Sequence, residues 1–267
     1  MKVLQIDPTC VTPGELAAAG GRCQFTTFKF DDHATLLWAP WNEAEWERPV
    51  FPVETAKYHP IIIHGHPVNQ PRRTACYDHP YAYSGQVHPI EPETPAAVTA
   101  LYGHVATLFP GERVNMCLAN GYYHGYHCIS AHGDNERQMN GMTNVYCFVV
   151  GATRRMVIRK KSNMNEILLD VMLPEGLYVM QGSNFQKIYT HEFPRMYYDF
   201  GKTFAPKLGG KMTSMEKADW CLTHQEEVRA HIRGLKKKVK TDSGLSLIEE
   251  FELWCQARFS FTLRYFG

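Results

Sequence analysis

The fold class is decided by residues 143–180, which read TNVYCFVVGATRRMVIRKKSNMNEILLDVMLPEGLYVM. β-Branched and aromatic residues dominate four short runs in this region, at 143–150, 154–160, 166–173 and 177–180. Glycine, proline, serine and asparagine separate the runs, and these residues favour tight turns. Many short strands joined by tight turns predict a sandwich, barrel or jelly roll rather than a parallel α/β sheet.

Further elements are predicted on both sides of this region. Additional strands are expected at residues 25–30, 114–120, 185–189 and 257–266. Residues 95–108 are predicted to form a helix, because apolar side chains recur there at helical spacing. These apolar positions are Val98, Leu101, Val105 and Leu108. The chain is therefore expected to be mostly β with helices, an α+β protein.

The pattern changes at residues 201–255, where a helical insertion before the last strand is predicted. Two capping boxes open helices in this segment, and an apolar stripe at helical period follows the first of them. The capping boxes are Thr213 with Glu216 and Ser246 with Glu249, and the stripe consists of Val228, Ile232, Leu235 and Val239.

The predicted insertion is partly basic. Residues 201–241 contain ten Lys or Arg against four Asp or Glu, an excess of six positive charges. Arg155, Arg159 and Lys161, on one face of a predicted strand, add to this basic character. Contact with nucleic-acid phosphates is one interpretation, and it predicts binding that weakens steeply with salt. A protein partner, a second subunit or a solvated helix face are the alternatives that the sequence leaves open.

The composition is that of a globular protein, with 44% hydrophobic and 21% charged residues. A formal net charge of +1 excludes a global field that draws the protein onto nucleic acid, so any polyanion contact must be local. Eight scattered cysteines without a C-x-x-C pair predict reduced thiols. The N-terminal residues have no apolar signal-peptide core, and no apolar run is long enough to span a bilayer. An intracellular location, cytoplasmic or nuclear, without a membrane partner is therefore predicted.

A candidate metal site lies in residues 120–136, NGYYHGYHCISAHGDNE. In an extended backbone residues two apart point to the same side, so His132 and Asp134 can present an imidazole and a carboxylate to one ion. His191, expected just after the strand 185–189, is the candidate third ligand. Two histidines and one carboxylate leave positions free on a non-haem Fe(II) ion for a co-substrate and O2. His124 and His127 lack a matching carboxylate and are interpreted as loop or surface residues.

Two arginines strengthen this interpretation. Arg258 and Arg264 are six residues apart in the last predicted strand, so both side chains point to the same face. Two arginines on a core strand are costly to bury unless anionic partners accompany them. A guanidinium binds a carboxylate through two hydrogen bonds, and 2-oxoglutarate has a carboxylate at each end.

Together these motifs resemble the AlkB family of Fe(II)- and 2-oxoglutarate-dependent dioxygenases. The resemblance consists of N-x-Y, H-x-D-x-E, a distal histidine and R-x5-R in the last strand. These motifs place Asn120, Tyr122, His132, Asp134, Glu136, His191, Arg258 and Arg264 on family positions. Upstream, residues 71–77 (PRRTACY) and 81–85 (YAYSG) are similar to the family's nucleotide-recognition segment.

The resemblance implies a double-stranded β-helix, or jelly-roll, core formed by residues 95–200 and 256–267. Residues 1–94 are then an N-terminal extension and nucleotide-recognition lid of the same single domain, 1–267. His132, Asp134 and His191 are expected to hold Fe(II), to which 2-oxoglutarate and O2 bind. Arg258 is expected to bind the distal carboxylate of 2-oxoglutarate, and Arg264 to lie near its other end and Asp134. The co-substrate's remaining expected contacts are Asn120, Tyr122 and Ser260, which stands where many family members have Asn.

The implied activity is oxidative demethylation of N-alkylated bases in DNA or RNA, with release of succinate, CO2 and formaldehyde. Tyr83 and His132 match the residues that sandwich a single-stranded or flipped base, and Glu136 matches an acidic residue at the base edge. The other expected substrate contacts are Arg72, Tyr81 and Ser84, with His64 where duplex-repairing members carry an apolar finger. Hydroxylation of a base carbon or a protein side chain is an alternative, and a non-catalytic binding module is a third.

Overall fold

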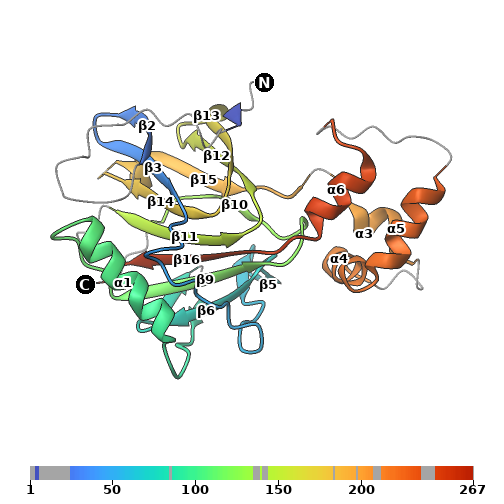
Figure 1. Cartoon of the computed structure of the whole chain (residues 1–267), viewed down its shortest axis with the longest axis horizontal. Coiled ribbons are helices and arrows are strands. Elements are labelled where there is room, and N and C mark those ends of the chain that lie inside the picture. Colours follow the sequence, from blue (N-terminus) through green and yellow to red (C-terminus); the bar gives the residue numbers. More distant parts are fainter. Residues whose placement is uncertain are drawn as a thin grey trace.

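The computed structural model describes residues 25–83, 86–134, 139, 144–182, 184–196, 198–206, 212–235 and 244–266, together with the backbone of Leu4–Gln5. Within this part of the chain the strands form two main sheets and two hairpins (Figure 1). The larger sheet has the order β2 (Thr26–Asp31), β3 (Ala34–Pro40), β14 (Gly176–Gln181), β11 (Val145–Gly151), β16 (Arg258–Arg264), β9 (Met116–Tyr122) and β6 (Arg73–Tyr77).

The smaller sheet packs against the larger one. Its order is β1 (Leu4–Gln5), β13 (Asn163–Leu173), β12 (Arg154–Lys160), β15 (Tyr189–Phe193) and β10 (Ile129–His132). The hairpins are β4 (Pro60–Ile63) with β5 (His66–Asn69), and β7 (Tyr81–Tyr83) with β8 (Gln86–His88). Two facing sheets, antiparallel except for the pairing of β1 with β13, agree with the predicted jelly-roll architecture.

Alternation along the strands separates two apolar layers. On β16, Phe261 and Leu263 face away from the smaller sheet and join a core with α1 (Ala96–Leu108). On β12, Met156 and Ile158 point between the two sheets and pack in a second core with β11, β13 and β14. Because the larger sheet is covered on both faces, its central strands β9 and β11 are buried at nearly every position. The polar side chains that point between the sheets are therefore exceptions that call for a chemical explanation.

A helical segment connects β15 to β16 and lies to one side of the sheets, on the right in Figure 1. It consists of α3 (Phe200–Phe204), α4 (Ser214–Thr223), α5 (Gln225–Gly234) and α6 (Leu247–Trp254). Its own apolar cluster includes Phe200, Val228, Phe251 and Trp254. The capping boxes predicted at Thr213 and Ser246 are confirmed at the starts of α4 and α6.

Several sequence predictions are wrong in detail. Residues 185–189 are not a strand, since Phe185–Ile188 form the short helix α2, in which Phe185 packs edge-on against Phe30. The apolar stripe ends early, because α5 stops at Gly234 and Leu235 is 45% exposed. Val239 lies outside the described residues. The misprediction at residues 185–188 has a simple reason: the four-residue helix α2 is too short for periodicity to distinguish it from a strand.

The core also extends further toward the N-terminus than predicted. Strands β2, β3 and β6 belong to the larger sheet, although residues 1–94 were expected to form an extension and lid. β3 pairs with β14 over six residues, and β6 pairs with β9 over five. Sequence periodicity does not reveal these pairings because they join segments far apart in the chain.

No described helix is both long and apolar enough to cross a lipid bilayer. Among the described residues, Cys76, Cys117, Cys128, Cys147 and Cys221 are buried free thiols, and Cys255 is partly buried. The predicted reduced state agrees with these six cysteines.

Candidate metal centre and its cavity

The three predicted ligands meet at one end of the smaller sheet. Strands β10 and β15 are antiparallel, and their register sets His132 directly opposite His191. The two imidazole rings are 4.3 Å apart, and Asp134 follows two residues after His132. One ligand atom from each of the three residues lies within 4.8 Å of the other two. His191 is in strand β15 and not after a strand, so cross-strand pairing rather than chain proximity brings it to the site.

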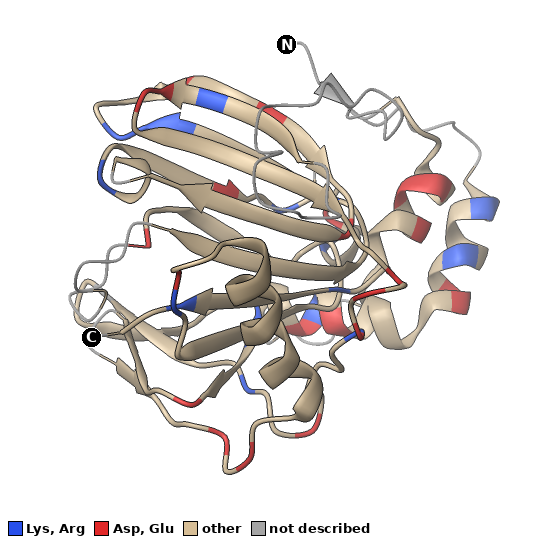
Figure 2. Ribbon diagram, turned by 60° about the vertical axis from the view of Figure 1, so that its left-hand side comes forward, with Lys and Arg blue, Asp and Glu red and all other residues tan. Residues whose placement is uncertain are grey.

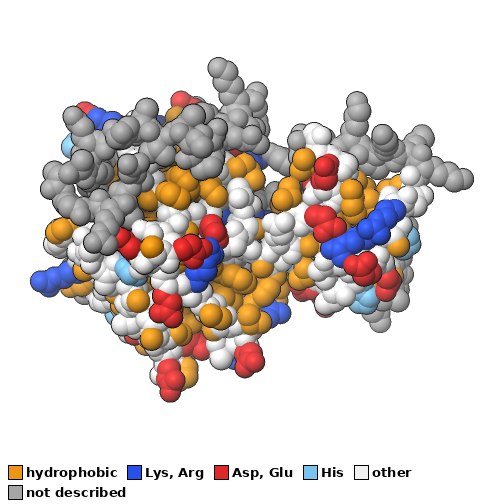
Figure 3. Space-filling model, viewed as in Figure 1, with side chains coloured by type: hydrophobic (Ala, Val, Ile, Leu, Met, Phe, Trp, Pro, Cys, Tyr) orange, Lys and Arg blue, Asp and Glu red, His pale blue; other side chains and the backbone are white. Residues whose placement is uncertain are grey.

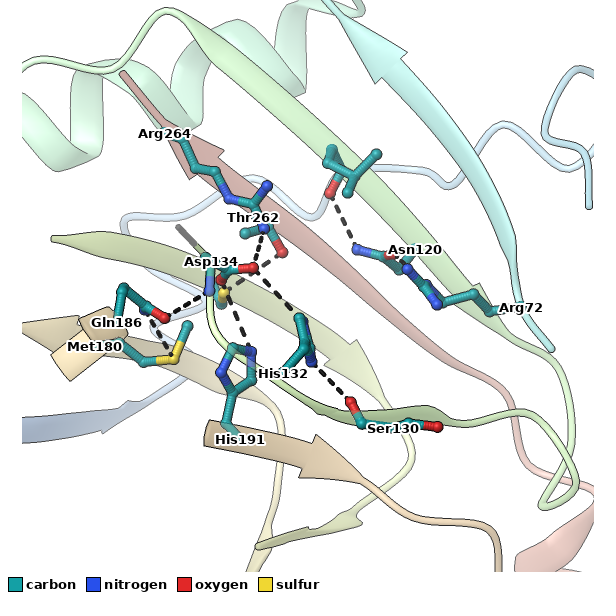
Figure 4. Close-up of polar contacts among 12 residues, drawn as sticks. Arg72, Asn120, Ser130, His132, Asp134, Met180, Gln186, His191, Thr262 and Arg264 are labelled. Atoms are coloured by element: carbon teal, nitrogen blue, oxygen red, sulfur yellow. Dashed lines mark hydrogen bonds and ion pairs between the residues drawn. The ribbon is translucent and has the colours of Figure 1, made fainter. Parts of the chain in front are cut away.

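The turn between His132 and Asp134 depends on glycine. A Cβ atom on Gly133 would lie 2.8 Å from the Gln186 carbonyl oxygen and 2.9 Å from Lys161 Nζ. Lys161 Nζ donates to that carbonyl at 2.7 Å, and the Asp134 backbone N–H donates to Gln186 Oε1 at 2.7 Å (Figure 4). Gln186 belongs to α2, so this helix, found where a strand was predicted, directly supports the loop that carries Asp134.

The protonation states suit a divalent cation. Burial alone raises the pKa of Asp134, but the Arg264 guanidinium and the two histidines outweigh burial and hold it well below its usual range. Arg264 Nη2 donates to Asp134 Oδ1 at 2.6 Å. Burial, reinforced by the neighbouring His132, lowers the pKa of His191 to about 3, so its imidazole is neutral at pH 7. An ionised carboxylate and neutral imidazoles are the forms that bind metal.

The histidine orientation also fits a metal ion. His132 Nδ1 lies 2.8 Å from the Ser130 carbonyl oxygen, which only accepts, so Nδ1 carries the proton and Nε2 keeps a free lone pair. His132 Nε2 is 3.5 Å from Asp134 Oδ1, and His191 Nε2 is 3.8 Å from Asp134 Oδ2. A hydrogen bond from the distant ring nitrogen to a carbonyl is the usual support of a metal-binding histidine.

A cavity connects the candidate ligands to both predicted binding regions. On the side of the larger sheet it is lined by Asn120, Tyr122, Ser260, Thr262 and Arg264. On the side of residues 61–83 it is lined by Ile61, Gln70, Pro71, Arg72, Tyr81 and Tyr83. The structure thus brings together most of the residues predicted for co-substrate and substrate.

Two of the predicted co-substrate residues are less accessible than expected. Asn120 Oδ1 accepts from Arg72 Nε at 2.8 Å, which joins a predicted substrate residue to a predicted co-substrate residue. Arg258 lies behind the cavity wall rather than in it, with its guanidinium 5.1 Å from the Phe193 ring centre. Its Nη1 donates to the carbonyls of Ala152 and Leu173 at 3.0 and 2.8 Å.

The predicted substrate residues divide into three groups. The Tyr81 and Tyr83 rings are nearly parallel, at 5° with their centres 6.2 Å apart, and both line the cavity. His64 lies at the exposed tip of the β4–β5 hairpin with φ of 49°, in the left-handed region that the turn requires. Ser84 and Glu136 lie outside the described residues.

A second group of two histidines and an aspartate was missed by sequence reasoning. His124, His127 and Asp219 lie as close together as the first set, within 4.8 Å, and both histidines are buried. Both histidines lie in the loop after β9, as predicted, but they are buried and not at the surface. Their carboxylate partner is 92 residues or more away in the chain, on α4, so no local spacing reveals it.

The predicted basic strand face is neutralised. Arg155 pairs with Asp170 at 2.7 Å and Arg159 with Glu192 at 2.7 Å. Elsewhere Lys and Arg are interspersed with Asp and Glu over the described part of the chain (Figure 2), and the face in Figure 3 shows basic side chains beside acidic ones. The basic residues 236–240 lie outside the described residues.

A jelly roll whose cavity holds two histidines and one ionised aspartate is typical of a non-haem iron oxygenase. A family model of the 2OG-Fe(II) oxygenase superfamily matches residues 36–264, and the chain belongs to that superfamily. Enzymes of this family use Fe(II), 2-oxoglutarate and O2. No curated protein matches the chain.

Proposed function

We propose that this oxygenase is an oxidative demethylase of N-alkylated bases in DNA or RNA. The observation that carries the proposal is one cavity shared by the candidate metal ligands and an aromatic wall from residues 61–83. A base must leave its stack to reach a metal centre, and it then requires a flat slot beside that centre. Tyr83 and His132 both line the cavity, and stacking on an aromatic side chain contributes about 1–3 kcal/mol per base.

A buried amide supports recognition of a polar edge. Gln70 lines the cavity, is only 2% exposed, and its Nε2 has no hydrogen-bond partner among the described residues. A buried amide without a partner costs about 1–3 kcal/mol unless a ligand satisfies it. Nucleobases carry ring nitrogens and carbonyl oxygens that accept such a hydrogen bond. Sequence reasoning missed Gln70, whose only signal is its place next to the 71–77 motif.

Bound Fe(II) with 2-oxoglutarate supplies the oxidising chemistry that yields succinate and CO2 and hydroxylates a substrate C–H bond. The protein's own contribution is to hold the target methyl group beside the metal and to exclude other orientations. Tyr81 and Tyr83 provide the flat wall, and Arg72, which lines the same cavity, donates to Asn120. On an N-methyl group, the hydroxymethyl product releases formaldehyde and leaves the unmodified base.

The test uses the whole protein with Fe(II), ascorbate, 2-oxoglutarate and short DNA and RNA strands. The strands carry 1-methyladenine, 3-methylcytosine, 6-methyladenine or 5-methylcytosine, and mass spectrometry follows both strands and succinate. A loss of 14 Da from particular strands supports the proposal and identifies the polymer. Succinate with unchanged strands, under conditions where Asp134→Ala gives none, contradicts it.

A matched variant separates base recognition from iron chemistry. Tyr83→Ala is expected to lower kcat/KM for the methylated strand by about 5- to 100-fold, because it removes one stacking surface. Succinate formation without a strand is expected to stay at the wild-type level. An equal loss in both assays would mean that Tyr83 supports the fold and not the substrate.

One observation favours a protein substrate as the second candidate. Ile62 and Val68 on the β4–β5 hairpin are 38% and 44% exposed, next to Ile61 in the cavity wall. Exposed apolar side chains beside a site suit an apolar partner surface, and Arg155 and Arg159, predicted as part of a basic face, are each paired with a carboxylate. A stable gain of 16 Da on a peptide, with no formaldehyde, would favour this hydroxylase over the demethylase.

A further inference from the structure

Arg154 is buried in an environment that no contact within the described residues explains. Its side chain is on β12, and the residue is 5% exposed. Met156 and Ile158, two and four residues further along, point between the sheets, so Arg154 points there as well. Its Nε, Nη1 and Nη2 atoms are all buried and have no hydrogen-bond partner in the part of the chain that the structure describes. Buried guanidinium groups are almost always paired, so this one lacks its anion.

Arg154 lies beside the other partly unpaired arginine, Arg258. Arg154 pairs with Leu173 in the β12–β13 ladder, and the Leu173 carbonyl accepts from Arg258 Nη1. Arg258 Nη1 also donates to the carbonyl of Ala152, two residues before Arg154, while no described residue is a hydrogen-bond partner of Arg258 Nη2. The two neighbouring side chains therefore hold four buried nitrogen atoms that have no hydrogen-bond partner among the described residues.

No described carboxylate neutralises either group. Neither arginine forms a described ion pair, in contrast to Arg264, which binds Asp134, and Arg155, which binds Asp170. Burial and the charge of Arg258 lower the pKa of Arg154 to about 10, and burial lowers that of Arg258 to about 10. Both groups remain cationic at neutral pH, so this end of the interior carries two uncompensated positive charges.

This position lies on the far side of the cavity from the metal ligands. On β16, Arg264 contacts Asp134, and Arg258 is six residues earlier, at the start of the strand. On β12, Ile158 pairs with His191, and Arg154 is four residues earlier, also at the start of its strand. Tyr122 and Phe193 line the cavity on this side, and Phe193 is in contact with Arg258. The two arginines thus stand where the end of 2-oxoglutarate remote from the metal is expected.

We propose that Arg154 is a second binding residue for the distal carboxylate of 2-oxoglutarate, acting together with Arg258. Two guanidinium groups can surround one carboxylate and satisfy the four unpaired nitrogen atoms more fully than either can alone. The co-substrate thereby compensates charges that are unpaired in its absence, and its binding stabilises the interior between the sheets. Because only the co-substrate is involved, the outcome does not depend on which substrate is oxidised.

The test compares two ligands on Mn(II)-loaded protein, in which binding is measured by calorimetry without turnover. 2-Oxoglutarate carries the distal carboxylate, and 2-oxopentanoate has a methyl group in its place. Arg154→Met is expected to weaken 2-oxoglutarate binding by about 10- to 100-fold, the range for lost charge-assisted hydrogen bonds. Binding of 2-oxopentanoate is expected to change less than about threefold, so the preference between the ligands collapses.

Controls separate this role from a structural one. Arg155→Met, on the outer face and paired with Asp170, is expected to leave the ligand preference unchanged. The ligand-free Arg154→Met protein is expected to melt at the wild-type temperature or above it, because an unpaired buried cation has been removed. Arg154→Lys keeps the charge but loses the planar guanidinium, and an intermediate preference is expected.

An equal loss of affinity for both ligands in Arg154→Met would overturn the proposal, and so would unchanged affinity for both. If Arg154→Met does not fold, the same comparison of ligands in Arg154→Lys decides. There, a wild-type preference for 2-oxoglutarate together with a lowered ligand-free melting temperature means that Arg154 is structural.

Discussion

Two clusters of two histidines and one aspartate lie among the described residues, and the side chains of only one are oriented as metal ligands require. His132, Asp134 and His191 face the cavity, whereas His124, His127 and Asp219 join the loop after β9 to helix α4. Both sets bring their potential ligand atoms within 4.8 Å of one another. Residue types and distances therefore do not distinguish them.

The difference lies in which ring nitrogen the backbone uses. In the second cluster, His124 Nδ1 accepts from the Tyr126 N–H at 3.2 Å, and His127 Nδ1 accepts from the Tyr123 N–H at 3.1 Å. An accepting Nδ1 leaves the proton of a neutral imidazole on Nε2. His124 Nε2 then donates to Asp219 Oδ1 at 3.2 Å, and His127 Nε2 donates to the Tyr58 hydroxyl oxygen at 3.0 Å. The nitrogen that faces the centre of the cluster is protonated and cannot bind a metal.

In the metal cluster the backbone acts in the opposite way. The Ser130 carbonyl accepts from His132 Nδ1 and leaves Nε2 free, as a ligand requires. Arg264 in addition keeps Asp134 ionised, whereas Asp219 is half-exposed and accepts hydrogen bonds. A backbone carbonyl that accepts from Nδ1 thus suits a histidine to metal binding, whereas a backbone N–H that donates to Nδ1 suits it to a structural role.

Replacement of either aspartate tests this comparison most strongly. Asp134→Ala is expected to lower iron affinity by more than about 100-fold. Mutation of residues that only support the metal ligands already costs about 10- to 100-fold in affinity. It is also expected to abolish succinate formation. Asp219→Ala is expected to retain one Fe(II) per chain, measured by elemental analysis and calorimetry. Two equivalents in the wild type and one in Asp219→Ala would show that the second cluster also binds metal.

Removal of the Arg264 charge sharpens the difference between the aspartates. Arg264→Met leaves Asp134 buried without its cation, which raises its pKa and makes proton and metal compete. Mn(II) affinity without 2-oxoglutarate is expected to fall by about 10- to 100-fold at pH 6.5 and to recover partly at pH 8.5. A loss that is the same at both pH values would contradict the role of Arg264 in keeping Asp134 ionised.

Acid is expected to destabilise the structural cluster through His127. Burial, with the nearby His124 and Arg154, lowers the pKa of His127 to about 2, well below the unfolded value of about 6.5. The unfolded chain then binds the extra proton first, so stability is full above pH 6.5 and falls as pH decreases toward 2. The slope from this one group is about 1.4 kcal/mol per pH unit.

Urea unfolding of the metal-free wild type and His127→Gln between pH 7 and 4.5 measures that contribution. The variant is expected to have the shallower pH dependence, because its side chain does not titrate. Equal slopes would mean that His127 is already charged in the folded protein.

The smallest expected effect comes from Tyr58. Tyr58→Phe removes the hydroxyl that accepts from His127 and donates to Asp219 at 3.4 Å. One unsatisfied buried N–H is expected to cost about 1 kcal/mol of unfolding free energy, with Mn(II) affinity unchanged. Urea unfolding and calorimetry check the two parts, and a change in metal affinity would mean that the clusters are coupled.

The comparison also explains which parts of the site were predictable. His132 and Asp134 are two residues apart in an extended segment, so their common direction follows from strand geometry. Arg258 and Arg264 share a face of β16 for the same reason. Asp219, Gln70 and Arg154 were not predicted, because their roles depend on neighbours that are distant in sequence or on partners that are missing.

The sequence by itself determined the short strands of residues 143–180, the helix 96–108, the two capping boxes and the types of the metal ligands. These features depend on local periodicity and on the chemistry of single side chains, which the chain carries before it folds. Only the tertiary structure decided that residues 185–188 form a helix under Asp134, that β2, β3 and β6 join the larger sheet, and that Arg154 is buried without an anion. Each of these depends on contacts between segments or buried atoms that are far apart in the sequence.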